Sequence, residues 1–408
     1  MLWLAMVSGA LMAQKTIEVS VTNPAKEERK AQPVVLQLAA MGMDVRSAIV
    51  TQDGQEIASQ LDDLDGDGRM DELCFLTDLE KKGKQNFRVE LLPTGEPRQY
   101  EARVYADMML TNKKIKSSNK QDLYISSLTV DNGTNPYWML HHHGPAFENE
   151  LVAYRIYFDH RQTVDTYGKY HKGLELRQTQ FYPDNEQKAA GFGDDVLWVG
   201  NTFGLGTLRG WNGQEPQMLQ DVDHRTLRIL SRGPLRTVVE VVDEGWKSPA
   251  PNTWHPAPIT ARTLYILYAG RRDIQVDVRF NKPAADYRFA TGIINVKDSE
   301  EFSDRQGLRG CWGTDWPVSA KDSVGHKRET VGLGICIPVK HVVSELPANK
   351  DNYPYVISTP TDELHYAITF GSDNEDFGYH SAKEWFEYLK TWRKELEAPV
   401  EVSVREVR

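Results

Sequence analysis

Short runs of β-forming residues, each ended by a turn signal, recur along almost the whole chain and constrain its fold more than any other feature. The run KTIEVSVT at residues 15–22 alternates apolar and polar residues and stops at Asn23-Pro24, and DELCFLTDL at 71–79 follows an Asp-Gly-rich turn. Such alternation predicts strands that bury one face, and the Gly, Pro and Asp residues between the runs predict turns. The chain is therefore predicted to be all-β, with antiparallel sheets.

Two domains are expected, because 408 residues exceed what a single hydrophobic core usually organises. Strand spacing predicts a small β-sandwich over residues 15–105. Residues 106–127 are polar and lysine-rich, which predicts a linker or a solvated excursion. A large antiparallel sandwich is expected over residues 128–408.

One helix is expected near the C-terminus, in the segment SAKEWFEYLKTWRKELE at residues 381–397. Its apolar residues Trp385, Leu389 and Trp392 recur at helical spacing, and the Ser381 side chain can cap the first turn. The segment therefore predicts a helix in an otherwise β-rich chain.

The first residues, 1–14, are apolar and end in small side chains before Gln14. They resemble the end of a secretory signal peptide that lacks its basic start, and they are too short to span a membrane as a helix. A periplasmic or secreted protein without a membrane span is therefore expected. The alternative is that these residues form the buried first strand of a cytoplasmic protein.

Charge and cysteine content argue against two classes of function. The formal net charge of −10 argues against nucleic acid as a partner, because phosphate binding needs a basic face. Cys74, Cys311 and Cys336 lie far apart without CxxC spacing, which argues against a thiolate zinc site. All three are expected to be small buried residues, with a Cys311–Cys336 disulfide as the alternative.

The sharpest local motif is an acidic, glycine-containing segment over residues 63–72. Its alternate carboxylates followed by glycine can aim several oxygens at one centre, as Ca²⁺ requires, and the pattern matches the start of an EF-type loop. It departs from that loop where Cys74 replaces the bidentate glutamate. A structural calcium site is predicted, with a metal-free acidic hairpin turn as the alternative, and no organic cofactor is expected. The predicted site comprises Asp63, Asp65, Asp67, Arg69 and Asp71.

Three adjacent histidines, residues 141–143, precede Gly144-Pro145 and then Glu148. On a strand, His141 and His143 would share one side, because successive side chains alternate. Contiguous histidines otherwise lack the spacing of metal ligands on one element, so zinc is not the favoured interpretation. His143 and Glu148 are candidate catalytic groups, and His141 is a candidate substrate contact.

The next predicted strand, residues 150–159, has one face that carries Glu150 and Tyr154 and another that carries Arg155, Tyr157 and Asp159. Buried charges are costly unless they are paired, so this second face is hard to explain as core. We interpret it as the floor of a polar cleft. The alternative is a satisfied Arg155–Asp159 network at a sheet edge.

Two further segments carry candidate ligand contacts. In the segment 165–171 an acid, two phenols and a lysine surround Gly168, which would let the backbone approach a ligand, although an exposed turn explains the same residues. The glycine-rich segment 191–211 lacks the GxGxxG spacing of a dinucleotide site and suggests tight turns beside a binding surface. Its tryptophans, and those near residue 312, suit either sugar stacking or core packing.

The run GPAFENELVAYRIYFDHRQTVDTYGKY at residues 144–170, followed by GFGDDVLWVGNTFGLGTLRGW and YAGRRDIQVDVRF, resembles the DUF4861 family. The resemblance extends from about residue 127 onward and implies a galactose-mutarotase-like supersandwich. It also implies a polysaccharide-utilising Bacteroidetes-type organism and a link to pectin and uronate breakdown. The family pattern places polar residues at Glu148, Tyr154, Arg155, Tyr157, Asp165, Tyr167, Lys169 and Asp195, and all are present.

The favoured function is an enzyme acting on uronate-containing oligosaccharides. A lyase needs a base for the C5 proton and cations for the carboxylate. Tyr167 or His143 would be the base, and Arg155 and Lys169 would neutralise the carboxylate. The full set of predicted substrate contacts is His141, Tyr154, Arg155, Tyr157, Asp165, Lys169, Trp198, His224 and Trp312.

Three other functions stay open. A hydrolase needs two carboxylates at a set separation, for which Glu148 and Asp195 are the candidates. An epimerase needs an acid and a base, which His143 and Glu148 would supply. A periplasmic glycan-binding protein without catalysis would use the same aromatic and charged residues, but without a converging acid–base pair.

Overall fold

The computed structural model describes residues 14–248, 257–319 and 321–407 and divides into two compact units. The small unit comprises residues 1–101 and 398–408, and the large unit comprises residues 102–397. Strands account for 45% of the fold and helices for 9%, which confirms the all-β prediction. The predicted signal segment lies outside the described residues except for Gln14, so export stays a prediction.

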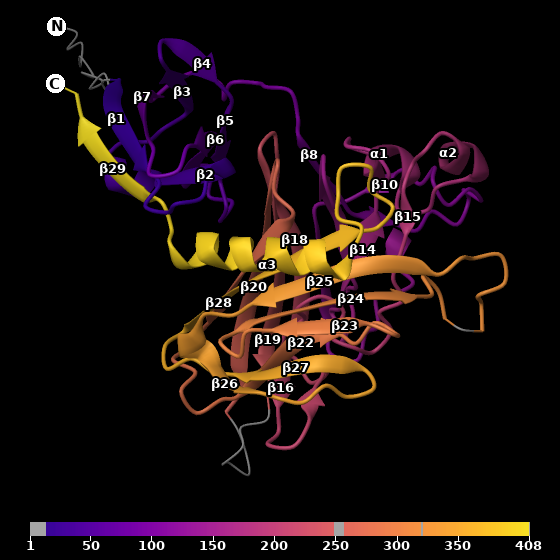
Figure 1. Ribbon diagram of the computed structural model, residues 1–408. Coiled ribbons are helices and arrows are strands. Elements are labelled where there is room, and N and C mark those ends of the chain that lie inside the picture. Colours follow the sequence, from indigo (N-terminus) through magenta and orange to yellow (C-terminus); the bar gives the residue numbers. More distant parts are fainter. Residues whose placement is uncertain (1–13, 249–256, 320, 408) are drawn as a thin grey trace, which may run out of the picture. The chain divides into compact units, whose positions relative to one another are not determined.

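The small unit is a β-sandwich of a five-stranded and a three-stranded sheet, with strand orders β29-β1-β7-β3-β4 and β2-β6-β5 (Figure 1). Alternate residues such as Ile17, Val19 and Val21 on β1 point into its core. The strands are β1 (Lys15–Thr22), β2 (Arg29–Gln37), β3 (Ser47–Gln52), β4 (Gln55–Ile57), β5 (Ser59–Asp62), β6 (Glu72–Leu79), β7 (Lys84–Leu92) and β29 (Glu401–Glu406).

The last strand of the chain belongs to this small unit, although the expected boundary placed it in the large domain. β29 pairs antiparallel with β1, so that Val402 lies opposite Val21 and Val404 opposite Val19. Alternation predicts that residues 401–406 form a strand, but it carries no information about which sheet edge the strand joins. The domain boundaries therefore differ from those expected at the C-terminal end.

The large unit contains a nine-stranded antiparallel sheet, two five-stranded sheets and a two-stranded sheet. Their orders are β11-β18-β19-β20-β21-β28-β25-β24-β23, β15-β14-β13-β12-β8, β17-β16-β22-β27-β26 and β10-β9. The first-half strands are β8 (Val104–Asp107), β9 (Met109–Leu110), β10 (Leu123–Tyr124), β11 (Ser127–Asp131), β12 (Ala146–Asn149), β13 (Ala153–Ile156), β14 (Val164–Gly168), β15 (Asp194–Asp195), β16 (Arg209–Trp211), β17 (Pro216–Gln217), β18 (His224–Arg232) and β19 (Arg236–Trp246). The others are β20 (Ile259–Tyr268), β21 (Asp273–Phe280), β22 (Phe289–Ile294), β23 (Glu300–Ser303), β24 (Leu308–Asp315), β25 (Glu329–Cys336), β26 (Val342–Glu345), β27 (Asn352–Ile357) and β28 (Glu363–Ser372).

The segment expected to be a linker, residues 106–127, is part of the large unit. It contains the end of β8 together with β9 and β10, and Met108 and Met109 are fully buried. The polar stretch rich in lysine therefore forms only the loop between β9 and β10, while its flanks pack into the fold.

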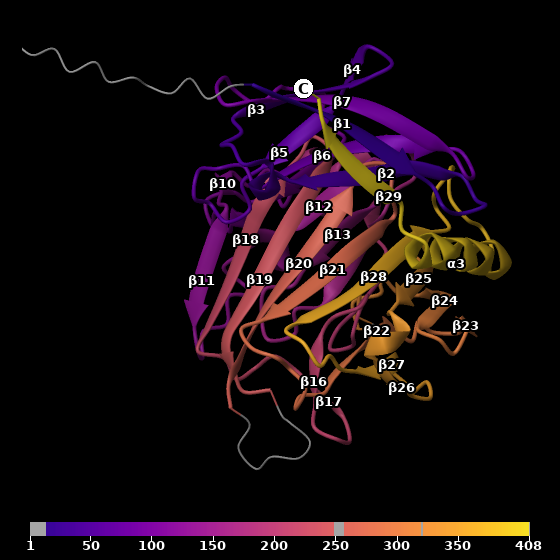
Figure 2. The same cartoon turned by 90° about the vertical axis from the view of Figure 1, so that its left-hand side faces the viewer.

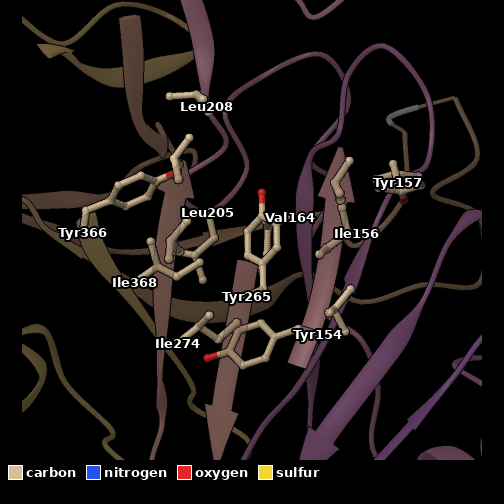
Figure 3. Close-up of a cluster of buried hydrophobic side chains, with 14 of the residues drawn as sticks. Tyr154, Ile156, Tyr157, Val164, Leu205, Leu208, Tyr265, Ile274, Tyr366 and Ile368 are labelled. Atoms are coloured by element: carbon tan, nitrogen blue, oxygen red, sulfur yellow. The ribbon is translucent and has the colours of Figure 1, made fainter. Parts of the chain in front are cut away.

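One continuous core fills the space between the nine-stranded sheet and the two five-stranded sheets. Tyr154 and Ile156 of β13 pack there with Tyr265 and Ile274 of the nine-stranded sheet (Figure 3). Tyr154 and Ile156 thus share one face of β13, as alternation predicts. Alternation then places Arg155 on the opposite, outer face of β13.

The predicted helix is confirmed as α3 (Ala382–Glu397), which packs over β24 and β25. Trp385, Leu389 and Trp392 are its buried face, and the Ser381 hydroxyl accepts a hydrogen bond from the Glu384 amide at 3.3 Å. Close approach depends on Gly332 of β25, because a Cβ there would lie 2.6 Å from the Trp385 ring. Two shorter helices, α1 (Leu176–Thr179) and α2 (Asn185–Ala189), follow β14.

Cys74, Cys311 and Cys336 are buried, which confirms the interpretation of small buried residues, and Cys311 and Cys336 do not form the alternative disulfide. Cys311 lies opposite Leu333 in the β24–β25 pair, and Cys336 lies opposite Leu308. In the described part of the chain, no helix is long and apolar enough to cross a membrane.

Candidate functional site

The outer face of β13 and β14 carries a charged network centred on Arg155. Its Nε and Nη2 donate to Asp165 Oδ2 at 2.9 and 2.7 Å, and Nη2 also donates to Asp195 Oδ2 at 2.8 Å. The Tyr157 and Tyr182 hydroxyls accept from the same guanidinium at 2.7 and 3.1 Å. Each nitrogen of Arg155 thus has an acceptor within the protein, which favours a role in holding the two aspartates over the predicted direct contact with a substrate carboxylate.

The strand register explains this pairing and corrects the alternative Arg155–Asp159 network. Arg155 lies directly opposite Asp165 in the β13–β14 pair, while Asp159 binds Arg161 through Oδ2 at 2.6 Å. Asp195 on β15 lies opposite Tyr167, which is two residues after Asp165 on β14. Three adjacent strands therefore bring the three groups together.

The two aspartates differ in the support that their charge receives. Asp165 is fully buried and accepts from Arg155, from the Tyr157 hydroxyl at 3.1 Å and from the Thr166 amide at 2.8 Å. Asp195 has fewer donors, and burial together with the neighbouring Asp165 charge raises its pKa well above the usual value. Its side chain is one-fifth exposed. Burial raises the pKa of Asp165 as well, although Arg155 opposes this effect, so Asp195 is the carboxyl of the pair that binds a proton more readily.

The three histidines form a tight 3₁₀ turn, not the predicted strand. His142 and His143 have φ of +42° and +67°, in the left-handed region that side chains seldom adopt. Gly144 follows because a Cβ at this position would lie 1.7 Å from the Ile156 carbonyl oxygen. His141 and His142 are consequently buried, and only His143 is half-buried.

His143 is held as a neutral imidazole. Its Nδ1 lies 2.9 Å from the Tyr137 carbonyl oxygen and must carry the proton of that hydrogen bond, so Nε2 is left with its lone pair. Burial lowers the pKa of His143 to about 4. The ring stacks on Tyr137 at 3.7 Å and on Tyr157 at 6.0 Å between centroids. His143 therefore joins the Arg155 network through Tyr157.

Aromatic and cationic side chains that the sequence analysis did not select border this cluster. Trp138 is 76% exposed, and its ring meets the edges of Tyr137 and His143. The Arg161 guanidinium lies over the rings of Tyr137 and Tyr157 at 4.8 and 5.0 Å. The adjacent aromatic residues Tyr137 and Trp138, shortly before the histidines, were the sequence feature that could have indicated this part of the site. Trp198, which was predicted, is 47% exposed.

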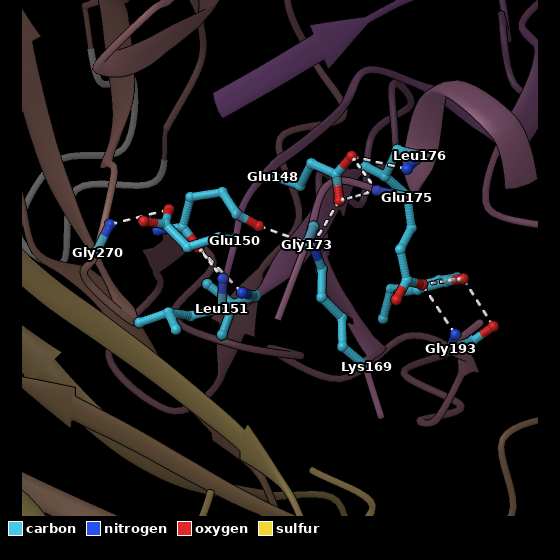
Figure 4. Close-up of polar contacts among 12 residues, drawn as sticks. Glu148, Glu150, Leu151, Lys169, Gly173, Glu175, Leu176, Gly193 and Gly270 are labelled. Carbon is cyan, nitrogen blue, oxygen red and sulfur yellow. Dashed lines mark hydrogen bonds and ion pairs between the residues drawn. The ribbon is translucent and has the colours of Figure 1, made fainter. Parts of the chain in front are cut away.

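Glu148 and Lys169 form an ion pair at 2.6 Å with no exposed side-chain surface (Figure 4). The Glu148 carboxylate also accepts from the Glu175 and Leu176 amides, and Lys169 donates to the Asn149 carbonyl at 2.7 Å. Both charges are therefore paired and hydrogen-bonded within the protein. This arrangement favours a structural ion pair over the predicted roles of Glu148 as a catalytic group and Lys169 as a substrate contact.

Several other predicted site residues are also structural. Tyr167 is fully buried and donates to the Gly193 carbonyl at 2.6 Å, and burial raises its pKa, which disfavours it as a base. Tyr154 is buried in the core. Trp312 packs against Trp385 beneath α3.

Two predicted histidine contacts lie beside the network or apart from it. The His141 ring meets the Tyr182 ring edge-on at 5.5 Å, and burial lowers the pKa of His141 to about 3. His224 is exposed on β18 and binds Asp131 at 3.0 Å. His141 therefore supports the wall of the cluster, whereas His224 belongs to another surface.

The acidic segment in the small unit lies between β5 and β6. Asp63, Asp65 and Asp71 each bring a carboxylate oxygen within 4.8 Å of the others, so this partly exposed triad could hold a metal ion. Gly66 and Gly68 adopt φ of +81° and +86° to close the loop. Asp67 and Arg69 are not part of the triad.

Comparisons with known proteins give one family and a distant structural likeness. The domain of unknown function DUF4861 matches residues 21–402. None of the curated proteins matches the chain. An α-mannosidase from Enterococcus faecalis V583 covers 97% of the chain at 10% identity with a TM-score of 0.49, and a protein in glycosyl hydrolase family 38 from Enterococcus faecalis gives the same values. The chain spans 46% and 48% of these two proteins, about half their length.

Proposed function

We propose that this chain, which belongs to the DUF4861 family, processes a carbohydrate on the outer face of β13 and β14 by acid–base catalysis. Asp195 is the acid and His143 is the base. The observation that carries the proposal is geometric: the His143 ring, whose Nε2 keeps its lone pair, stacks on Tyr157, and both the Tyr157 hydroxyl and the Asp195 carboxylate accept from Arg155 Nη2. The Tyr157–Arg155 contact joins the two groups on one side of the sheet.

The surrounding residues suit a sugar. An exposed indole such as Trp138 can stack on the C–H face of a sugar ring, since aromatic faces are apolar and carry negative charge. Arg161 lies over the Tyr137 ring with its side chain 17% exposed, and it can face a uronate carboxylate while it stays bound to Asp159. We therefore propose a uronate-containing oligosaccharide as the substrate.

β-Elimination is the reaction that this geometry supports best. His143 Nε2 takes the C5 proton, the C4–C5 double bond forms as the C4–O bond breaks, and Asp195 protonates the departing oxygen. Hydrolysis needs two carboxylates that flank the scissile bond, about 5 to 9.5 Å apart. Here Asp165 and Asp195 share one guanidinium nitrogen, and Asp165 has no exposed surface. Burial of Glu148 likewise disfavours the His143–Glu148 epimerase.

The proposal is tested by incubating the purified chain with oligogalacturonates. A lyase gives products with the ultraviolet absorbance of an unsaturated uronate. New reducing ends without that absorbance would contradict elimination and indicate a hydrolase. Binding without either product would contradict catalysis and indicate a glycan-binding protein.

We predict a bell-shaped pH profile of kcat/KM. The rate should rise as pH increases through about 4, because His143 must lose its proton to act as a base. It should fall again as pH passes the raised pKa of Asp195, because the acid must keep its proton. An acid limb near the ordinary histidine pKa, about 6.5, would contradict the role of His143.

For the acidic segment we propose Ca²⁺ as the metal, because hard carboxylate oxygens in a glycine-containing loop suit it. Calcium at a hundredfold excess over its Kd should stabilise the small unit by about 2.7 kcal/mol, measured as a rise in Tm. Asp65→Asn should remove most of this rise. The matched control is Glu96→Gln, which removes one exposed charge from the same unit and should leave the calcium effect intact. Equal Tm values with calcium and with a chelator would contradict the site.

A further inference from the structure

The face of the nine-stranded sheet that points away from the core contains a second polar surface. A groove of about 560 Å³ runs over β11, β18, β19, β20 and β21, which lie side by side in Figure 2. It is lined by Thr129, Thr226, Arg228, Arg262, Arg279 and Asn281, among others. The groove shares no lining residue with the Arg155 network.

Strand register explains why these side chains gather. Thr226, Arg262 and Arg279 belong to one row of directly paired residues across the sheet. Arg228 lies opposite Glu240 two rows further along the strands. Residues two apart on a strand point to the same face, so both rows project outward while the row between them enters the core. These side chains therefore gather because of how the strands pair, and their positions do not depend on a single loop.

Two arginines in this groove are fixed by one buried carboxylate. Glu240 has no exposed side-chain surface and binds Arg228 through Oε2 and Arg262 through Oε1. The two arginine side chains remain 38% and 36% exposed. Among the described residues, Arg228 Nη1 and both Nη atoms of Arg262 bind no acceptor. Glu240 thus orients two cations, and these three groups carry a net positive charge with free donors. Glu244 and Arg279, which also line the groove, add one charge of each sign.

Those donors match one class of ligand. The planar guanidinium forks suit a carboxylate, and two adjacent forks can clamp it. Beside them the Thr129 and Thr226 hydroxyls lie 2.9 Å apart and can exchange hydrogen bonds with ligand hydroxyls. A carboxylate flanked by hydroxyl groups is the repeating chemistry of an acidic oligosaccharide.

We propose that this groove binds a carboxylate-bearing oligosaccharide, with Arg228 and Arg262 on the carboxylate and the two threonines on sugar hydroxyls. Its ligand has the same chemistry as the proposed substrate, but the site rests on separate residues. It would therefore stand if Asp195 and His143 proved to have no catalytic role. A sulfated oligosaccharide offers a related oxyanion, and the test distinguishes the two.

The test measures binding of trigalacturonate to the full chain by calorimetry, in an Asp195→Asn background so that turnover cannot interfere. Arg262→Gln and Arg228→Gln should each weaken binding about tenfold, because a charge-assisted contact is lost. Each variant leaves the other arginine on Glu240, so the buried carboxylate keeps a counter-ion. Arg177→Gln, an exposed arginine on α1, is the matched control and should bind like the parent.

The fully methyl-esterified trimer has the same hydroxyls without the charge and should also bind about tenfold more weakly. Equal affinity for the esterified and free trimers would overturn the proposal. Unchanged affinity in both arginine variants would overturn it as well. Tighter binding of a sulfated trimer would overturn the carboxylate assignment. If the groove variants lose binding but no conditions give product, only the proposed reaction fails.

Discussion

Asp195→Asn should lower kcat/KM on an acidic oligosaccharide by about 10²- to 10⁴-fold, the usual contribution of a general acid. The asparagine can still accept the hydrogen bond from Arg155 Nη2, but it has no acidic proton to give to the departing oxygen. Arg155 keeps Asp165 as its partner, at 2.7 Å. The free energy of unfolding should therefore change little, and kinetics with parallel urea unfolding measure both quantities.

The neighbouring Asp194 provides a matched control for this experiment. It lies on the same strand and binds Lys188 at the surface, and its Oδ1 accepts from the Asp195 amide at 2.9 Å. Asp194→Asn keeps that acceptor and should retain nearly full activity. If Asp195→Asn kept parental activity, or if both variants lost it equally, Asp195 would not be the acid.

The local features of this fold could be predicted from sequence because they depend on neighbours along the chain. Alternation around residue 155 places Tyr154 and Ile156 on one face of the strand and Arg155 on the other, and β13 has this arrangement, with Tyr154 and Ile156 in the core. Helical spacing located α3 and its buried tryptophans. Each of these inferences needs only the period of one element.

The errors concern contacts between segments that are distant in sequence. Trp312 was a candidate sugar contact, but α3 returns about seventy residues later and covers it. The alternative network of Arg155 with Asp159 is wrong because a period-two pattern does not reveal the strand register, which places Asp165 opposite Arg155. His143 was assigned to a strand, since nothing local reveals that Gly144 must pass close to Ile156.

The sequence therefore predicted the region of the candidate site, but not the role of each residue in it. The segment 141–195 does contain the network, yet polar residues on one strand face divide between it and the buried Glu148–Lys169 pair. Which of the two a residue joins depends on what covers it. The main-chain amides that donate to the Glu148 carboxylate belong to Glu175 and Leu176, at the start of α1.

Lys169→Met should lower the free energy of unfolding by about 3–5 kcal/mol, the cost of leaving a buried charge without its partner. Glu148 would keep its amide donors but lose the cation 2.6 Å away, in a place that water does not reach. Burial already raises the pKa of Glu148, and Lys169 is the main group that opposes this effect. Urea unfolding near neutral pH measures the loss.

The pH dependence of that loss identifies its cause. Without Lys169 the pKa of Glu148 in the folded state rises further above its value in the unfolded chain, about 4.3. A raised carboxyl pKa costs stability above the unfolded value and nothing below it, so the deficit of the variant should shrink as pH falls toward 4.3. The double variant Glu148→Gln with Lys169→Met carries no charge there and should recover much of the stability at neutral pH. Activity lost in Lys169→Met at unchanged stability would instead mean that the lysine acts on substrate, because a structural ion pair cannot be removed from a dry interior without weakening the fold.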